Sequence, residues 1–208
     1  ARHPVISVNG NVATLAAGPV ARLVRRLPAL RVEANLFHRS EERVALVRDR
    51  LIAAGVGTVL GLRPTVPVPG LTSDRGRADA EGIAVADVCL IPLEDGDRTE
   101  ALRLWGKRVI SIDLNPLSRT SQEADLPIVD ELLRALAGLD RALPGAIAHA
   151  REGHFPSFDR QAALDGALET MARNLRRRTP ARSVSPPAPD RASPRRLPGT
   201  AGRSRRTR

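Results

Sequence analysis

Residues 91–121 read IPLEDGDRTEALRLWGKRVISIDLNPLSRTS, and this stretch decides the fold. An apolar run over residues 85–93 ends at a dense charged cluster, and a second apolar run over residues 109–114 ends at a polar one. Two short apolar runs separated by a helix-length segment predict buried parallel strands joined by a crossover helix. Because ligands of such sheets bind beyond the carboxyl ends of the strands, we expect the chemistry of this chain at the two clusters.

The same alternation extends in both directions along the chain. We expect further strands over residues 5–8, 32–37, 57–62 and 126–130. Helical spacing of apolar residues predicts helices that start at Gly18-Pro19 and at Ser40, and others over residues 99–106, 131–150 (interrupted at Pro144-Gly145) and 162–175. The pattern predicts an α/β protein with a Rossmann-like, mostly parallel sheet and flanking helices.

The net charge of +10 arises in the C-terminal part of the chain. Residues 176–208 hold 11 of the 33 basic residues and one acidic residue, so the preceding part carries 22 of each sign. This segment is rich in Pro and Ser and poor in apolar side chains, which predicts disorder. We therefore divide the chain into a globular domain over residues 1–175 and a disordered basic tail over residues 176–208.

A basic tail of this kind can bind nucleic acid through phosphate contacts that weaken with salt. However, no aromatic residues alternate with its arginines for base stacking, and Lys107 is the only lysine of the whole chain. We favour the interpretation that the tail is an extension in an arginine-rich protein. Nucleic-acid binding is expected only through the tail, if at all.

Cysteine content and hydropathy set further limits. The single cysteine, Cys89, excludes an intramolecular disulfide and is expected to be a small buried core residue. No apolar run reaches the roughly 18 residues of a membrane span, and no signal peptide opens the sequence, so we expect a cytoplasmic protein without membrane association. Because the chain begins with Ala1 and reaches a strand within four residues, we expect its natural start to lie upstream.

Two polar segments follow the first two predicted strands. Asn9 and Asn11 flank a glycine, where amides could contact a phosphate or ribose; an ordinary Asn-Gly turn is the alternative. Asn35, His38 and Arg39 form the second segment, which could bind an anionic substrate group or could be a solvated helix start. The chain has neither GxGxxG nor GxxxxGK[ST], which disfavours an NAD-dependent oxidoreductase and a P-loop enzyme.

The charged cluster after residue 93 contains three carboxylates within four residues. Mg²⁺ held by Asp95 and Asp97 together with nucleotide phosphates would relieve their repulsion, and Arg98 offers an internal counter-charge as the alternative. Asp95, Asp97 and Arg98 are also candidates for contacts with the substrate or its phosphate. After residue 112, Asp113 could bind a ribose hydroxyl, and the run Ser118-Arg119-Thr120 supplies donors for phosphate. No side chain is assigned a catalytic role.

Four long motifs resemble archaeal phosphopantothenate synthetase, also called 4-phosphopantoate–β-alanine ligase. They are SVNGNVA at residues 7–13, EANLFHRSEER at 33–43, PLEDGDRTEAL at 92–102 and IDLNPLSRT at 112–120. The shorter segments PGL at residues 69–71 and EGI at 81–83 also fit the family pattern. The resemblance covers residues 5–175 in order, so residues 1–175 resemble a ligase domain.

The resemblance implies a ligase of coenzyme A biosynthesis that joins 4-phosphopantoate to β-alanine. ATP would be consumed with Mg²⁺, an acyl adenylate would form, and AMP and diphosphate would be released. By carry-over, the ATP contacts are Asp113, Leu114, Asn115, Arg119, Thr120, Glu131 and Leu132. The family usually has Asn-Val at the last two positions, so a backbone contact is expected there.

The family also implies a homodimer and a helical segment before the strand at residues 5–8, which supplies arginines to the nucleotide site. This chain lacks that segment, so we expect weakened ATP binding if the sequence is complete. A non-catalytic nucleotide-binding module with a nucleic-acid-binding tail is the alternative function.

Overall fold

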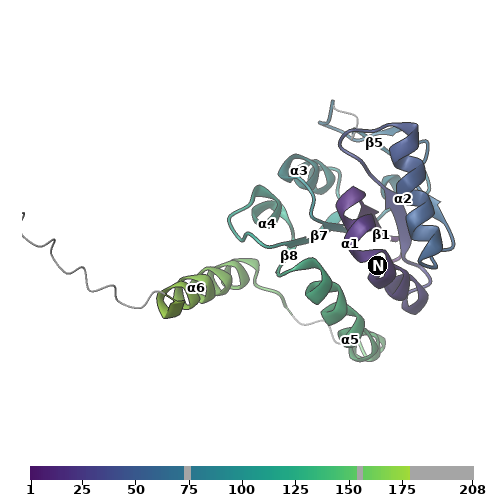
Figure 1. The fold of residues 1–208 in the computed structure, drawn as a ribbon. Coiled ribbons are helices and arrows are strands. Elements are labelled where there is room, and N and C mark those ends of the chain that lie inside the picture. The colour runs from purple at the N-terminus through teal and green to yellow at the C-terminus, as the bar shows by residue number, and fades with distance from the viewer. Residues whose placement is uncertain (73–75, 154–156, 179–208) are drawn as a thin grey trace, which may run out of the picture.

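The computed structural model describes residues 1–72, 76–153 and 157–178, and it contains the predicted α/β fold (Figure 1). Six parallel strands form one sheet in the order β3-β2-β1-β6-β7-β8. Their bounds are β1 Pro4–Val8, β2 Arg31–Ala34, β3 Val59–Leu60, β6 Val88–Pro92, β7 Arg108–Asp113 and β8 Leu126–Val129. The order reverses between β1 and β6, so a switch point lies between these two strands.

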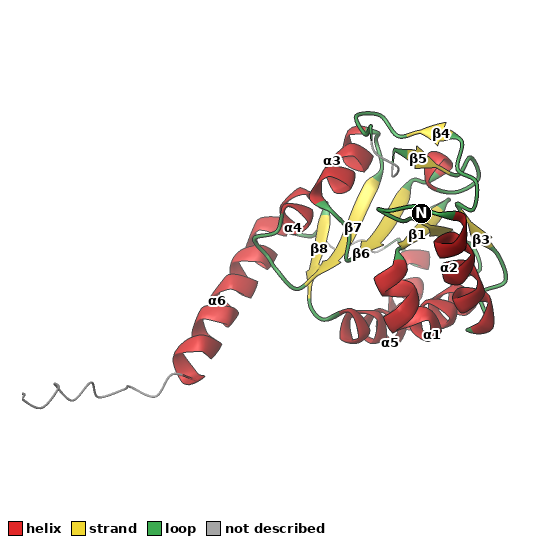
Figure 2. Cartoon of the chain, turned by 45° about the horizontal axis from the view of Figure 1, so that its top comes forward, coloured by secondary structure: helices red, strands yellow, loops and turns green. Residues whose placement is uncertain are grey.

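Helices cover both faces of the sheet (Figure 2). One face carries α1 Gly10–Arg26, α2 Glu41–Ala53 and α5 Leu132–Arg151. The other carries α3 Gly96–Leu104, α4 Arg119–Glu123, a 3₁₀ turn at Ile83–Val85 and a small antiparallel pair, β4 Val66–Pro67 with β5 Arg77–Ala78. Helix α6, Arg160–Arg178, contacts β8 and extends away from the rest of the domain.

The core consists of two apolar layers, one on each face of the sheet. Neighbouring residues of a strand point to opposite faces, so Ile6 packs with α1, α2 and α5 while Val5 packs with α3. Cys89 belongs to the second layer and is fully buried, as expected. Burial raises the pKa of its thiol to about 12, which makes it unreactive at neutral pH.

Helix α1 begins eight residues earlier than the Gly18-Pro19 start that we expect from the sequence. Its N-cap is Asn9, whose side chain accepts from the Val12 N–H, and Pro19 lies inside the helix. Proline has no N–H to donate, and its ring crowds the carbonyl four residues earlier. The backbone accordingly leaves helical geometry at Ala16, with φ −133°, and the helix continues across this kink.

Other boundaries also differ from the expectations. Strand β2 ends at Ala34 instead of residue 37, α5 runs without a break through Pro144, and α6 continues to Arg178. Helix α4 and the β4–β5 pair were not expected at all. Both are very short, and α4 is held mainly by its Ser118 cap and by packing on α3, which periodicity cannot show.

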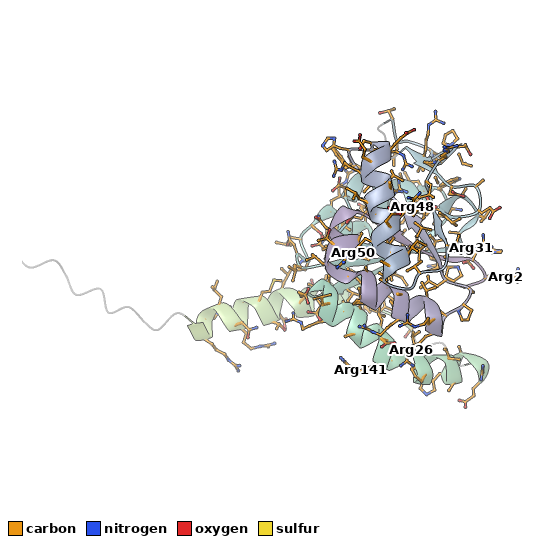
Figure 3. All side chains as sticks on the ribbon, turned by 45° about the vertical axis from the view of Figure 1, so that its right-hand side comes forward. Arg2, Arg26, Arg31, Arg48, Arg50 and Arg141 are labelled. Carbon is orange, nitrogen blue, oxygen red and sulfur yellow. The ribbon has the colours of Figure 1, made fainter. Side chains whose placement is uncertain are left out.

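Arginines of the described part lie on helices α1, α2 and α5, just before β1 and at the start of β2, as the labelled side chains in Figure 3 illustrate. Several are paired: Arg26 on α1 with Asp140 on α5 at 2.5 Å, and Arg48 with Asp49 on α2 at 2.7 Å. None of the described helices combines the length and apolar character needed to cross a membrane. Most of the expected disordered tail, residues 179–208, lies outside the described residues.

Candidate active site

The loops that follow β1 and β6 meet at the switch point of the sheet. Asn9, directly after β1, donates from Nδ2 to the carbonyl of Leu93 at 2.8 Å, while its Oδ1 caps α1 at 3.0 Å. The Nδ2 end of this amide therefore joins the two loops, and its Oδ1 end caps α1. Asn11, in the first turn of α1, is exposed and lies beside this junction.

The loop after β6, residues 93–95, has an unusual backbone. Leu93 has φ 51°, and among the described residues it is the only non-glycine with a positive φ. Such a conformation costs about 1 kcal/mol or more and persists only where the surroundings enforce it. Here Asn9 holds the Leu93 carbonyl, and Thr120 Oγ1 on α4 donates to the Glu94 carbonyl at 2.6 Å. The loop is thus held by the residue that caps α1 and by a residue of α4.

A buried arginine side chain pairs with this loop. Arg98 of α3 is 1% exposed, and its Nε lies 3.8 Å from the Glu94 carboxylate, which is also buried. The buried amide of Asn35, after β2, lies against the guanidinium and accepts from it when its oxygen faces Arg98. Arginine is almost never fully buried without such partners. Asn35 and Arg98, both expected at a ligand, are therefore brought together in an internal network.

Glu33 is a site residue that the sequence reasoning missed. This fully buried carboxylate of β2 accepts from the backbone N–H groups of Asp79 at 3.2 Å and Ile83 at 2.6 Å. Burial raises its pKa to about 6, although the two N–H donors and the charge of Arg98 oppose that shift. The available signal was that Glu33 is the one charged residue inside the strand predicted over residues 32–37.

Glycines make room for Glu33. Gly61 has φ +75°, and a Cβ there would come within 2.7 Å of the Glu33 Cγ. A Cβ on Gly82 would overlap the carboxylate itself. The Glu33 side chain therefore ties β2 to the segment between β5 and β6, at the edge of the crevice.

The loop after β7 is ordered by its own side chains. Asp113 accepts from the Asn115 N–H at 2.9 Å and from Ser118 Oγ at 2.7 Å, and Asn115 Oδ1 accepts from the Leu117 N–H at 2.9 Å. Leu114 is 56% exposed. The loop is thus held in one shape with Leu114 and the adjacent backbone turned outward.

Helix α4 follows this loop and carries Arg119 and Thr120. The Arg119 guanidinium pairs with Asp97 and Glu100 of α3, and the Thr120 hydroxyl is buried against the Glu94 carbonyl. Asp97 therefore has a cationic partner within the chain. The described residues contain no group of three or more His, Cys, Asp or Glu able to hold a metal ion.

At the end of β8, Glu131 is the N-cap of α5. Its carboxylate accepts from the N–H groups of Leu133 and Arg134, both at 3.0 Å. Leu132 is 3% exposed, so its side chain belongs to the core. A ligand contact of Leu132 would therefore involve its backbone, while the carboxylate of Glu131 is engaged in capping α5.

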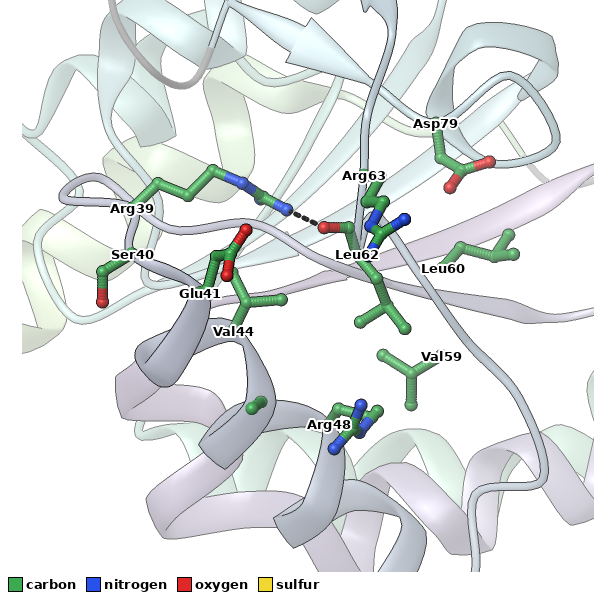
Figure 4. Close-up of a pocket in the computed structure, with 11 residues that line it drawn as sticks. Arg39, Ser40, Glu41, Val44, Arg48, Val59, Leu60, Leu62, Arg63 and Asp79 are labelled. Carbon is green, nitrogen blue, oxygen red and sulfur yellow. Dashed lines mark hydrogen bonds between the residues drawn. The ribbon is translucent and has the colours of Figure 1, made fainter.

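A groove of about 830 Å³ lies at the β2–β3 side of the same edge (Figure 4). Arg39, Arg48 and Arg63 line it together with Glu41 and Asp79. Arg39 donates to the carbonyls of Gly61 and Leu62, both at 2.6 Å, which fixes its side chain along the groove. The predicted partner of Arg39, His38, is exposed and lies edge-on to the ring of Phe37.

The sheet order and the polar loops at its switch point define an α/β protein of the Rossmann class, in which ligands bind at the carboxyl edge of the sheet. The family described as phosphopantothenate/pantothenate synthetase matches residues 1–174, and the chain belongs to this family. The resemblance found in the sequence motifs is thereby confirmed.

Curated relatives carry the name 4-phosphopantoate–beta-alanine ligase. That of Thermococcus kodakarensis is 52% identical over 136 residues, which are 65% of this chain and 52% of the relative. That of Methanosarcina mazei is 52% identical over 139 residues, 67% of this chain and 54% of the relative. That of Methanospirillum hungatei is 52% identical over 142 residues, which are 68% of this chain and 57% of the relative. The chain spans about half the length of the curated relatives it matches.

Proposed function

We propose that this chain joins 4-phosphopantoate to β-alanine at the expense of ATP, as a cytoplasmic, homodimeric enzyme of coenzyme A biosynthesis. The observation that carries the proposal is the family match over residues 1–174, which includes every loop at the carboxyl edge of the sheet. The names of the relatives, about 52% identical, support the choice of substrates.

The reaction that we propose has two displacements. A carboxylate oxygen of 4-phosphopantoate attacks the α-phosphorus of ATP, and diphosphate leaves. The β-alanine nitrogen then attacks the acyl carbon of the adenylate, loses a proton, and AMP leaves. Both steps depend on positioning and on donors aimed at developing negative charge. The N-terminus of α1, at Gly10, follows the carboxyl end of β1 and suits such charge, and a Cβ at Gly10 would meet nothing within 4 Å.

We assign ATP to the loops after β7 and β8. Asp113 uses its carboxylate for the loop, but a carboxylate has about four acceptor positions, which leaves room for a ribose hydroxyl. Leu114 and Asn115 would contribute backbone groups, and Arg119 and Thr120 stand beside them on α4. Glu131 and Leu132 would contact the nucleotide through their backbone.

The phosphate of 4-phosphopantoate is assigned to the Arg39 side of the crevice. Arg39 and Arg63 line the groove there, and His38, which precedes Arg39 in the chain, is exposed. Neighbouring strands are about 4.8 Å apart, so β2 and β7, three positions apart, are separated by roughly 14 Å. The acid would lie between these two strands, with its carboxylate toward the nucleotide and its phosphate toward the Arg39 side chain.

Mg²⁺ is proposed as a partner of the nucleotide. Because Asp97 pairs with Arg119, we propose an ion held mainly by phosphates and water, with Asp95 at the N-cap of α3 as the candidate carboxylate. Bound in that way, Mg²⁺ would neutralise the charge of the leaving diphosphate.

The test follows the fate of carboxyl oxygen. The protein is incubated with ATP, Mg²⁺, β-alanine and 4-phosphopantoate labelled with ¹⁸O in its carboxylate. We expect one labelled oxygen in AMP, and AMP formation that requires the acid. ADP as the product, or unlabelled AMP, would refute the proposal. Light scattering of the same preparation tests the homodimer, which a monomeric mass would contradict.

A further inference from the structure

We infer that Gly96 is a positioning residue, which seats Arg119 at the nucleotide side of the crevice because it has no side chain. The inference rests on the proposed function in one respect, the contact of Arg119 with ATP. The close approach of the two residues is independent of that assignment.

The contact joins the first residue of α3 to the first residue of α4. A Cβ built on Gly96 would lie 2.5 Å from both Cβ and Cγ of Arg119 and 2.8 Å from its Cδ. Carbon atoms that are not bonded to each other pack at about 3.5 Å or more. Rotating the arginine side chain cannot relieve the overlap with its Cβ, since that atom is attached directly to the backbone. Only glycine allows α4 to approach α3 this closely.

Two further contacts act on the same junction. The guanidinium of Arg119 pairs with Asp97 and Glu100, so α3 orients the charged end of the side chain as well as its stem. Thr120, the next residue of α4, donates to the Glu94 carbonyl at 2.6 Å. The start of α4 is therefore held against residues 94–100 at three points, and an added methyl group at position 96 must displace it.

The test combines Gly96→Ala with Arg119→Gly in a double-mutant cycle. Arg119→Gly removes both the guanidinium and the Cβ that the new methyl group would strike. The matched control is Gly145→Ala in α5, where a Cβ would meet nothing within 4 Å. Affinity for ATP is measured by calorimetry, and KM for ATP, KM for the acid and kcat by AMP release.

We expect Gly96→Ala to weaken ATP binding about tenfold, which corresponds to the loss of one charge-assisted hydrogen bond. KM for ATP should rise by the same factor, with KM for the acid and kcat within about twofold of wild type, because Arg119 would contact the nucleotide before and during reaction alike. In the Arg119→Gly background, Gly96→Ala should change ATP affinity less than twofold. Gly145→Ala should leave the ATP affinity, both KM values and kcat as they are in the wild type.

Equal effects of Gly96→Ala in both backgrounds would overturn the inference, because Gly96 would then act through something other than Arg119. Equal ATP affinity of wild type and Arg119→Gly would overturn it in another way, by removing Arg119 from the nucleotide site. The free energies of unfolding of wild type, Gly96→Ala, Arg119→Gly and the double variant distinguish the two failures. Coupling in stability without coupling in ATP affinity shows that the contact exists and that the assignment to ATP is wrong.

Discussion

At the scale of single residues, the crevice is organised by polar groups that bind other parts of the chain. Asn9, Asn35 and Arg98 were expected from the sequence to face a ligand, and each has a partner within the protein. Residue type and spacing indicate polar chemistry at an edge. They cannot indicate whether a neighbouring loop or a ligand receives it, because that depends on distances between segments far apart in sequence.

Glu33 should make stability depend on pH. Its folded pKa of about 6 lies above the ordinary 4.5, so the folded state binds the proton more tightly. This contribution is fully present below pH 4.5 and is lost as pH rises through 6. The free energy of unfolding should therefore fall by about 2 kcal/mol between pH 4.5 and pH 7 relative to Glu33→Gln. Urea unfolding measures it, with exposed Glu169→Gln as control, and parallel curves for wild type and Glu33→Gln would contradict it.

Asp113→Ala should lower activity far more than stability. The change removes the acceptor that shapes the loop after β7, and with it the proposed ribose contact. We expect kcat/KM for ATP to drop about tenfold or more, while the free energy of unfolding falls by about 1–2 kcal/mol for two lost hydrogen bonds. Steady-state AMP release and urea unfolding are the measurements, with exposed Asp165→Ala on α6 as control. Kinetics close to wild type would remove Asp113 from the site.

At the scale of elements, the carboxyl edge depends on how loops are tied across the switch point. The left-handed backbone of Leu93 shows that tertiary contacts override local preference at the end of β6. The sequence indicated where β6 and β7 end. It did not show α4, which has only five residues and needs α3 beside it.

Asn9 is the clearest test of these ties. Asn9→Ala removes both the cap of α1 and the bond to Leu93, and should cost about 2 kcal/mol of unfolding free energy. Asn9→Ser can still cap the helix but cannot reach Leu93, so it should cost about half as much. Urea unfolding measures both, and Asn11→Ala, exposed and two residues away, is the control. If Asn9→Ala stays within about 0.5 kcal/mol of wild type, the bridge does not contribute.

At the scale of the whole molecule, most of the net positive charge and the folded domain lie in different parts of the chain. Residues 179–208 contain eight arginines and one acidic residue, so most of the net charge lies outside the domain that carries the crevice. The proposed reaction uses groups of the domain alone. The basic tail should therefore be dispensable for it.

Deleting residues 179–208 should leave kcat/KM for ATP within about twofold of the full chain. Any binding of a labelled oligonucleotide should weaken between 50 mM and 200 mM salt, as phosphate–arginine contacts do, and should disappear on deletion. Anisotropy titrations and AMP release measure the two effects. Loss of activity would make the tail part of the enzyme, and retained oligonucleotide binding would place a nucleic-acid site on the domain.

The sequence by itself determined the fold class and the family, and it placed polar clusters at the carboxyl edge of the sheet. Each of these follows from local pattern: apolar runs of strand length, polar clusters directly after them, and long contiguous motifs. Tertiary structure alone decided the partners of Asn9, Asn35 and Arg98, the buried carboxyl of Glu33, and the seat of Arg119 on Gly96. These depend on close packing between segments separated by tens of residues, where differences of about 1 Å decide which atoms meet.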